Sequence, residues 1–283
     1  MTTAWLVSLP ESLTPGALQA HRGALATLPE RFRESTLTDR DAGPEQPSVG
    51  VVSLALPGWE QRLERLRGAL VTDLALLNPA DIERLAAVCE ASRLPIVPDL
   101  PELHEPAGRQ LATVLGEATA VRLVIGTGRS SGADVPSPVA LRTLALAQIT
   151  ALGPLISRGE ARIGPTRVGS DAFTCSLELG EVVVEMSAVL CRACPESTEI
   201  IVLGEGSLTR VVLQAGPTKW QSEMTEMTDG EELVMPARYS SGRREAWLRL
   251  YEALGEGGVD QTSSFLADLT RSVALLECLG LPW

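Results

Sequence analysis

The first part of the chain alternates short apolar segments with segments of helical periodicity, and this alternation is the strongest constraint on its fold. Parallel strands need long crossover connections, usually helices, so such a pattern predicts one parallel sheet with helices on both faces. We expect strands at residues 4–9, 34–38, 51–57, 69–73 and 94–97, with helices near 15–28, 61–68, 78–89 and 106–115. The chain therefore begins with a predicted Rossmann-like, doubly wound parallel sheet.

Two of these helices have clear start signals in the sequence. Thr14 precedes Pro15, and Asn78 precedes Pro79. A polar side chain at the N-cap accepts a free amide of the first turn, and proline is favoured at the first helical position. Both pairs therefore predict a helix start.

The pattern changes near residue 120. A strand at 121–127 and a helix at 137–156 are followed by five apolar segments with no helices between them, at 161–168, 172–179, 182–190, 198–203 and 208–213. Glycines at hairpin positions, Gly180 and Gly204–Gly206, favour antiparallel pairing. We therefore expect an α/β chain of two domains. Residues 1–120 form the Rossmann-like domain, and residues 121–283 form an α+β domain with an open, mostly antiparallel sheet. Helices at 243–254 and 262–279 close the chain, the last packing back on the first domain.

Composition excludes several classes of partner. The net charge of −12 disfavours nucleic acid and anionic membrane surfaces, and aromatic residues make up only 4% of the chain. Neither a signal peptide nor an apolar run of spanning length is present, and five cysteines are an odd number for a disulfide framework. These features predict a cytoplasmic protein with a small-molecule partner.

The first strand-to-helix turn lacks the features that bind a dinucleotide. The Rossmann fingerprint uses glycines so that backbone amides can approach the pyrophosphate. Between residues 8 and 21 the only glycine is Gly16, while Pro10 and Pro15 carry no amide hydrogen and Glu11 adds negative charge. Asp39 occupies roughly the place of the acidic ribose ligand. We therefore expect a degenerate site and no cofactor.

Three stretches carry a resemblance to a known family: Gly68–Leu85, Ser92–Val97 and the helix Ser263–Glu277. In this order along the chain they resemble the glucose–fructose oxidoreductase and inositol dehydrogenase (Gfo/Idh/MocA) family. The likeness extends loosely over residues 51–281, and residues 1–50 match only in outline. The resemblance implies a nicotinamide-dependent oxidoreductase fold and self-association through the second sheet.

The chain departs from this family at its catalytic positions. In the family, Glu-Lys-Pro follows the strand that corresponds to Leu70–Val71, and its lysine helps to move the proton during hydride transfer. Here those positions are Thr72, Asp73 and Leu74. The family also places an Asp and a His one turn apart on a helix that corresponds to 137–149, and this segment contains neither. A carboxylate at Asp73 cannot supply positive charge to a developing alkoxide, although it could act as a weak base.

Further candidates follow the strand at 94–97. The resemblance places this loop beside the substrate cleft, where Thr72, Asp73, Glu102, His104 and Glu105 could face one pocket. His104 is then the near-neutral acid or base. The alternative is that these are solvated loop charges, as is common for acidic loops.

We expect two other motifs to have structural roles. Cys191 and Cys194 have the spacing of a zinc pair, but no further ligands lie nearby in sequence, so we expect no metal site. Residues 126–132 are glycine-rich but lack the end of a P-loop, so we expect a linker or cleft lip.

Two hypotheses remain for the function. In the first, the chain is a divergent member of this family that has lost standard NAD(P)-dependent dehydrogenase chemistry. It then acts as a small-molecule binding or accessory protein, as a homodimer or with a related active enzyme. In the second, it is an active NAD(P)-dependent oxidoreductase with an atypical cofactor loop, using His104 or Asp73.

Overall fold

The computed structural model describes residues 4–35, 48–100, 104, 106–128, 137–157, 159–190, 196–215, 223–235, 241–255 and 258–282. The chain divides into two compact units. The first contains Met1–Pro101 and Ser241–Thr270, and the second contains Glu102–Ser240 and Arg271–Trp283. A boundary between folding domains at residue 120 stays a prediction.

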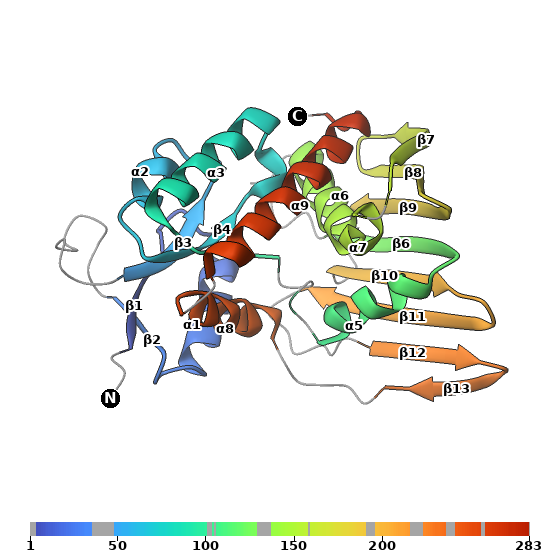
Figure 1. Cartoon of the computed structure of the whole chain (residues 1–283), viewed down its shortest axis with the longest axis horizontal. Helices are drawn as coiled ribbons and strands as arrows, with labels where there is room; N and C mark the ends of the chain where they lie inside the picture. Colours follow the sequence, from blue (N-terminus) through green and yellow to red (C-terminus); the bar gives the residue numbers. More distant parts are fainter. Residues whose placement is uncertain are drawn as a thin grey trace. The chain divides into compact units, whose positions relative to one another are not determined.

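The first unit is built on a five-stranded parallel sheet, drawn in Figure 1. Its strands are β1 (Trp5–Ser8), β2 (Phe32–Glu34), β3 (Ser48–Ser53), β4 (Gly68–Thr72) and β5 (Ile96–Pro98), in the order β2-β1-β3-β4-β5. Strand β2 lies on one side of β1, and β3, β4 and β5 follow one another on the other side. The point where the order reverses, between β1 and β3, is where open α/β sheets bind ligands.

Helices cover both faces of this sheet. They are α1 (Pro15–Ala26), α2 (Trp59–Leu63), α3 (Pro79–Ser92), α8 (Gly242–Ala253) and the first part of α9 (Gly258–Cys278). Helices α1 and α8 pack together, and α2 packs against α3. Right-handed crossovers in opposite directions from the centre of the sheet place α1 on one face and α2 and α3 on the other.

The two helix starts that the sequence predicts are both present. The Thr14 hydroxyl accepts the Ala17 amide at the start of α1. Asn78 and Asp81 form a reciprocal capping box at the start of α3. These caps satisfy amides that the first helical turn leaves without a backbone partner.

The core between α1, α8 and the sheet is aromatic and tightly packed. Trp247 of α8 is fully buried, with its ring 5.1 Å from Phe32. Gly68 of β4 allows α8 to lie close to the sheet, because a Cβ at this position would lie 2.9 Å from Leu254 Cδ2 and 3.0 Å from Leu250 Cδ1. Gly50 similarly permits close pairing of β3 with β1, because its Cβ would lie 3.0 Å from the Ser8 carbonyl oxygen.

The second unit contains an eight-stranded sheet in the order β13-β12-β11-β10-β6-β9-β8-β7. All neighbouring strands are antiparallel except β6 and β9, which are parallel. The strands are β6 (Ala120–Gly128), β7 (Ala161–Val168), β8 (Ala172–Leu179), β9 (Val182–Leu190), β10 (Glu196–Leu203), β11 (Ser207–Ala215), β12 (Glu223–Thr228) and β13 (Glu231–Val234). The expected α/β chain with a parallel and a mostly antiparallel sheet is therefore confirmed.

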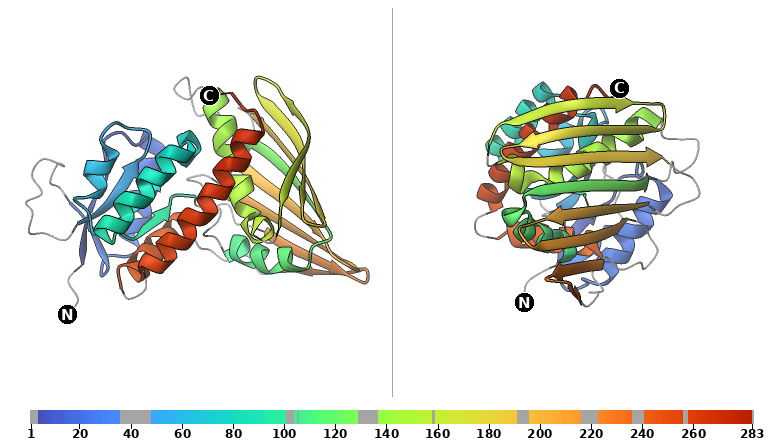
Figure 2. Two further views of the ribbon diagram at one scale, coloured as in Figure 1. Left: turned by 45° about the horizontal axis from the view of Figure 1, so that its top comes forward. Right: turned by 90° about the vertical axis from the view of Figure 1, so that its right-hand side faces the viewer.

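Within this unit, helices cover one face of the sheet. Figure 2 (left) shows α5 (Pro106–Val114), α6 (Ser137–Ala151) and α7 (Gly153–Ile156) on that side. Side chains alternate along the strands, so that β8 buries Phe173, Cys175, Leu177 and Leu179. The opposite face, seen in Figure 2 (right), carries no helix of the described residues and exposes Val183, Val189 and Leu203.

Most expected elements are present. The strand expected at 34–38 is β2, at Phe32–Glu34, and the helix expected at 61–68 is α2, which ends at Leu63. Further differences concern β3, the helix after β6 and the last two strands. The strand expected at 51–57 is β3 and ends at Ser53, because Leu54–Pro57 turn into α2. The helix expected at 137–156 is broken at Leu152 into α6 and α7. Strands β12 and β13 were not expected, because their acidic sequence hides the alternation of a strand.

Candidate functional site

The carboxyl edge of the parallel sheet carries a polar group built by two adjacent strands. Ser53 ends β3 and is paired in register with Thr72 at the end of β4, and Asp73 follows directly. Ser53 Oγ donates a hydrogen bond to Asp73 Oδ2 over 2.5 Å, and Thr72 Oγ1 donates to the same oxygen over 3.0 Å. Two hydroxyls therefore fix one carboxylate oxygen in place.

The backbone of Asp73 is held in a less common conformation. Its φ of 61° and ψ of 30° lie in the left-handed region, which Asp tolerates better than most residues. The Leu76 amide donates to the Asp73 carbonyl oxygen over 3.0 Å, which starts the short helix η1 (Leu74–Leu76). The side chain is exposed, while Ser53 is buried. The carboxylate is thus presented to solvent from a rigid base.

This arrangement determines which ligand groups the carboxyl edge of the parallel sheet can bind. Among the described residues, both hydrogen bonds to the carboxylate end on Oδ2, so Oδ1 can accept a further bond from a ligand donor. A carboxylate attracts cations and hydroxyl donors. It does not stabilise the negative charge that develops on a substrate oxygen when a hydroxyl is oxidised.

An internal hydrogen bond closes the turn between β1 and α1. The Leu13 amide donates to the Pro10 carbonyl oxygen over 3.2 Å, and Pro10 is buried. Leu9 and Leu13 pack against the hydrophobic core of the first unit. The turn therefore places apolar side chains against the core. A dinucleotide-binding site would instead expose backbone amides at this position.

The N-terminus of α1 has few amides to offer an anion. Pro15 has no amide hydrogen, and the Ala17 and Leu18 amides donate to the Thr14 hydroxyl and carbonyl oxygens over 3.3 and 2.9 Å. A Cβ added at Gly16 would meet no atom within 4 Å, so this glycine does not serve close packing. Gly16 therefore does not serve the tight turn or the close backbone approach for which the Rossmann fingerprint uses its glycines.

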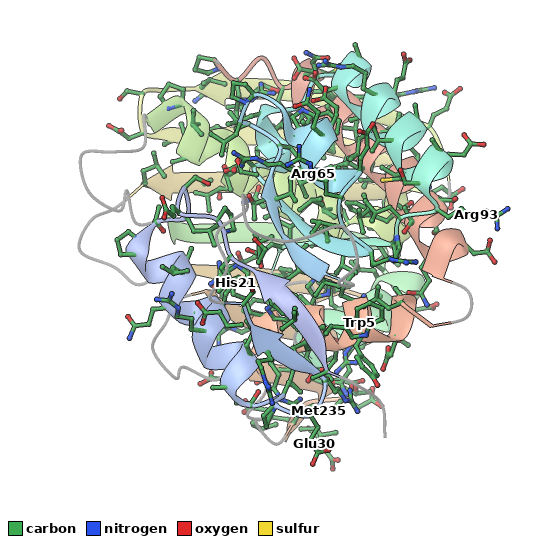
Figure 3. The ribbon with its side chains drawn as sticks, turned by 90° about the vertical axis from the view of Figure 1, so that its left-hand side faces the viewer. Trp5, His21, Glu30, Arg65, Arg93 and Met235 are labelled. Carbon is green, nitrogen blue, oxygen red and sulfur yellow. The ribbon has the colours of Figure 1, made fainter. Side chains whose placement is uncertain are left out.

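A second polar group lies buried in the first unit. His21 is fully buried on α1, where Figure 3 labels it. Its Nε2 lies 3.3 Å from Asp99 Oδ2, and Arg243 Nε lies 3.4 Å from Asp99 Oδ1. The imidazole also meets the Trp247 ring edge-on, with centroids 6.0 Å apart. These contacts tie α1 and α8 to the segment that follows β5.

This buried group refines the sequence interpretation. His21 packs inside the first unit, and its Nε2 also approaches the Asp99 carboxylate. Asp99 follows β5 directly. The apolar surroundings of His21 in sequence gave a signal of burial, but no local pattern links it to residues so distant in the chain.

The predicted site residues are placed differently by the structure. Thr72 and Asp73 come together at the sheet edge, and Ser53, which sequence analysis missed, completes the group. His104 belongs to the second unit, where it is 2% exposed. Asp39, Glu102 and Glu105 lie outside the described residues, so their roles stay predictions.

Helix α6 uses its buried polar side chains for structural contacts. Arg142 Nη2 lies 2.6 Å from Glu277 Oε1, and Gln148 Nε2 donates to the Ser187 carbonyl oxygen over 3.1 Å. The family resemblance implies an Asp and a His on this helix. Its polar groups instead hold α9 and β9.

Within the described ranges, no group of three His, Cys, Asp or Glu side chains could hold a metal ion. No helix in the described part of the chain is both long and apolar enough to cross a bilayer.

Comparison with solved structures identifies the fold. The 3-ketoreductase of Actinomadura kijaniata in complex with NADP and TDP-benzene is 14% identical, with a TM-score of 0.72 over 97% of this chain and 96% of that one. A dehydrogenase (MviM) from Clostridium difficile is 9% identical, with a TM-score of 0.67 over 98% and 99%. A protein assigned as an NADPH-dependent oxidoreductase from Desulfitobacterium hafniense is 12% identical, with a TM-score of 0.73 over 98% and 96%.

No family model matches the sequence, and no curated protein matches it. The resemblance to the glucose–fructose oxidoreductase and inositol dehydrogenase family is therefore confirmed at the level of the fold, and the low identities fit a divergent chain. These three proteins are a ketoreductase in complex with NADP, a dehydrogenase and a protein assigned as an NADPH-dependent oxidoreductase.

Proposed function

We propose that this chain, which has the fold of NADP-binding oxidoreductases, has lost their standard dehydrogenase chemistry and binds a small molecule at the carboxyl edge of β3 and β4. The observation that carries the proposal is Asp73, a rigid carboxylate at the position where the family has its proton-transferring lysine. The charge at this position is inverted, so the site favours a ligand that donates hydrogen bonds or carries positive charge.

The self-closed turn between β1 and α1 supports the same proposal. Prolines, a capping threonine and inward-facing leucines occupy the positions from which backbone amides would bind pyrophosphate. We therefore propose that the chain needs no nicotinamide cofactor and acts as a small-molecule binding or accessory protein, which we place in the cytoplasm.

The alternative is an active NAD(P)-dependent oxidoreductase with an atypical cofactor loop. The observation that favours it is the fold itself, since a structure with 97% coverage of this chain contains NADP. In that case Asp73 or His104 would act as the acid or base, and Asp39 would bind the ribose.

We also propose that the chain self-associates, as a homodimer or with a related active enzyme, through the helix-free face of the eight-stranded sheet. Val183 and Val189 are each 48% exposed there and Leu203 is 40% exposed. Exposed apolar residues gathered on one face are typical of interaction surfaces.

Thermal denaturation in the presence of millimolar polyols, sugars and amino sugars tests the ligand site. We expect at least one hydrogen-bond-donating compound to raise the Tm, and the Asp73→Asn variant to lose this shift. Asp229→Asn is the matched control, because Asp229 is another exposed Asp with a positive φ, of 54°, in a turn of the second unit. A ligand shift that persists in Asp73→Asn would reject this site.

A further inference from the structure

We propose that β13 is a docking edge for an extended, basic and apolar segment of another protein, which would add a strand to the eight-stranded sheet. This inference concerns the second unit and is independent of the small-molecule site. Strand β13 is the last strand of the sheet and pairs, among the described residues, with β12 alone. Such an edge presents unpaired backbone donors and acceptors on its outer side.

The side chains of β13 are unusually accessible for a strand. All four residues are exposed, and Leu233 and Val234 are 59% and 62% exposed. Of the large hydrophobic side chains in the described ranges, these two are the most exposed. They alternate along the strand, so one apolar side chain lies on each side of the sheet and both flank the free edge.

The hairpin that carries this edge is strongly acidic. Residues 223–234 contain five carboxylates and no basic residue, namely Glu223, Glu226, Asp229, Glu231 and Glu232. No cation in the described part of the chain forms an ion pair with these carboxylates. The turn itself is tight, with positive φ at Asp229 and Gly230, so the hairpin is a fixed ribbon and not a loose loop.

The carboxylates of the hairpin determine which kind of strand could pair with β13. Pairing of two β13 edges would place two hairpins that each carry five carboxylates and no basic residue side by side, which is unfavourable for like charges. The opposite edge of the sheet is protected, because β7 contains Pro165 and an irregularity between Ile163 and Thr166. A second copy of this chain therefore fits the β13 edge poorly.

A foreign strand in which two consecutive basic residues adjoin two consecutive apolar residues fits both features. Its lysines or arginines would face Glu231 and Glu232, and its apolar residues would cover Leu233 and Val234. Its backbone would pair with the free side of β13.

The test uses a fluorescein-labelled octapeptide in which pairs of lysines alternate with pairs of valines, titrated with the full chain and followed by fluorescence anisotropy. We expect binding in the range of tens of micromolar. A peptide with alternate amides N-methylated keeps its charge but loses the donors for strand pairing, and we expect at least about tenfold weaker binding.

Two variants locate the binding on the protein. Glu231→Lys with Glu232→Lys, and separately Val234→Pro, should each weaken binding about tenfold or more. Glu83→Lys with Glu90→Lys on α3 changes the net charge equally at exposed positions of the other unit and should leave the affinity unchanged. Circular dichroism confirms that each variant is folded.

Several outcomes would overturn the proposal. Equal binding of the N-methylated peptide, or equal weakening by the α3 variant, would mean general attraction to an acidic protein. No binding of either peptide at millimolar protein would remove the edge as a docking site. Sedimentation showing dimers that Val234→Pro dissociates would assign the edge to a second copy.

Discussion

Ser53 Oγ lies 2.5 Å from Asp73 Oδ2, although twenty residues separate the two in sequence. The contact exists because β3 and β4 are neighbours in the parallel sheet and end at the same level. The contact holds a carboxylate at the position where the family resemblance implies a lysine. The proposed function depends on this inversion of charge.

Removing the buried donor should destabilise the edge. In Ser53→Ala the Asp73 carboxylate loses its shorter hydrogen bond, and we expect the free energy of unfolding to fall by about 1–2 kcal/mol. Thr72→Val removes the longer bond at a more accessible position and should cost less. Urea denaturation measures both, and equal losses would show that the two hydroxyls contribute alike.

The buried ion-pair group should be far more sensitive than a surface pair. Asp99→Ala leaves the fully buried His21 and the largely buried Arg243 without their common carboxylate, and we expect a loss of about 3 kcal/mol. Glu34→Ala breaks the bidentate but solvent-exposed pair with Arg22 and should cost much less. Comparable losses in the two variants would contradict a structural role for the Asp99 group.

The sequence predicts the sheets well because their signals are local. Buried strands such as β3 and β4 are continuous apolar runs, and Thr14 and Asn78 mark helix starts within a few residues. Ser53 and Asp99 could not be found in this way, since their partners are brought together only by strand order and by α8 returning to the first sheet. The strands β12 and β13 were missed because five carboxylates mask their periodicity.

Alkaline pH should weaken the fold through two cysteines. Burial raises the pKa of the Cys89 thiol from its ordinary value of 9.0 to about 12, and the pKa of Cys175 to about 11. Above pH 9 the unfolded chain ionises these thiols while the folded chain keeps them protonated, so their contribution to stability is complete below pH 9 and is lost as pH rises toward about 11.

Urea denaturation at rising pH measures this loss. We expect Cys89→Ala to flatten the decrease in the free energy of unfolding above pH 9. Cys278→Ala, at an exposed position, should leave the slope unchanged. An unchanged slope in Cys89→Ala would show that other groups cause the alkaline loss.

Self-association through the helix-free sheet face has a direct test. Val183→Lys places a charge on the exposed apolar part of this face, and we expect it to convert dimers to monomers in sedimentation velocity. Val168→Lys is a suitable control, since Val168 is similarly exposed at 40% but is paired with the buried Phe173 and therefore lies on the other face of the sheet. Dimers that resist the Val183 change would place the interface elsewhere.

The most direct test of the central claim is calorimetric titration of the purified chain with NADPH and NADH at low salt. The self-closed first turn and the carboxylate at Asp73 predict no saturable binding at millimolar concentrations of either cofactor. Saturable binding at micromolar concentration would contradict the account and favour the alternative of an active oxidoreductase.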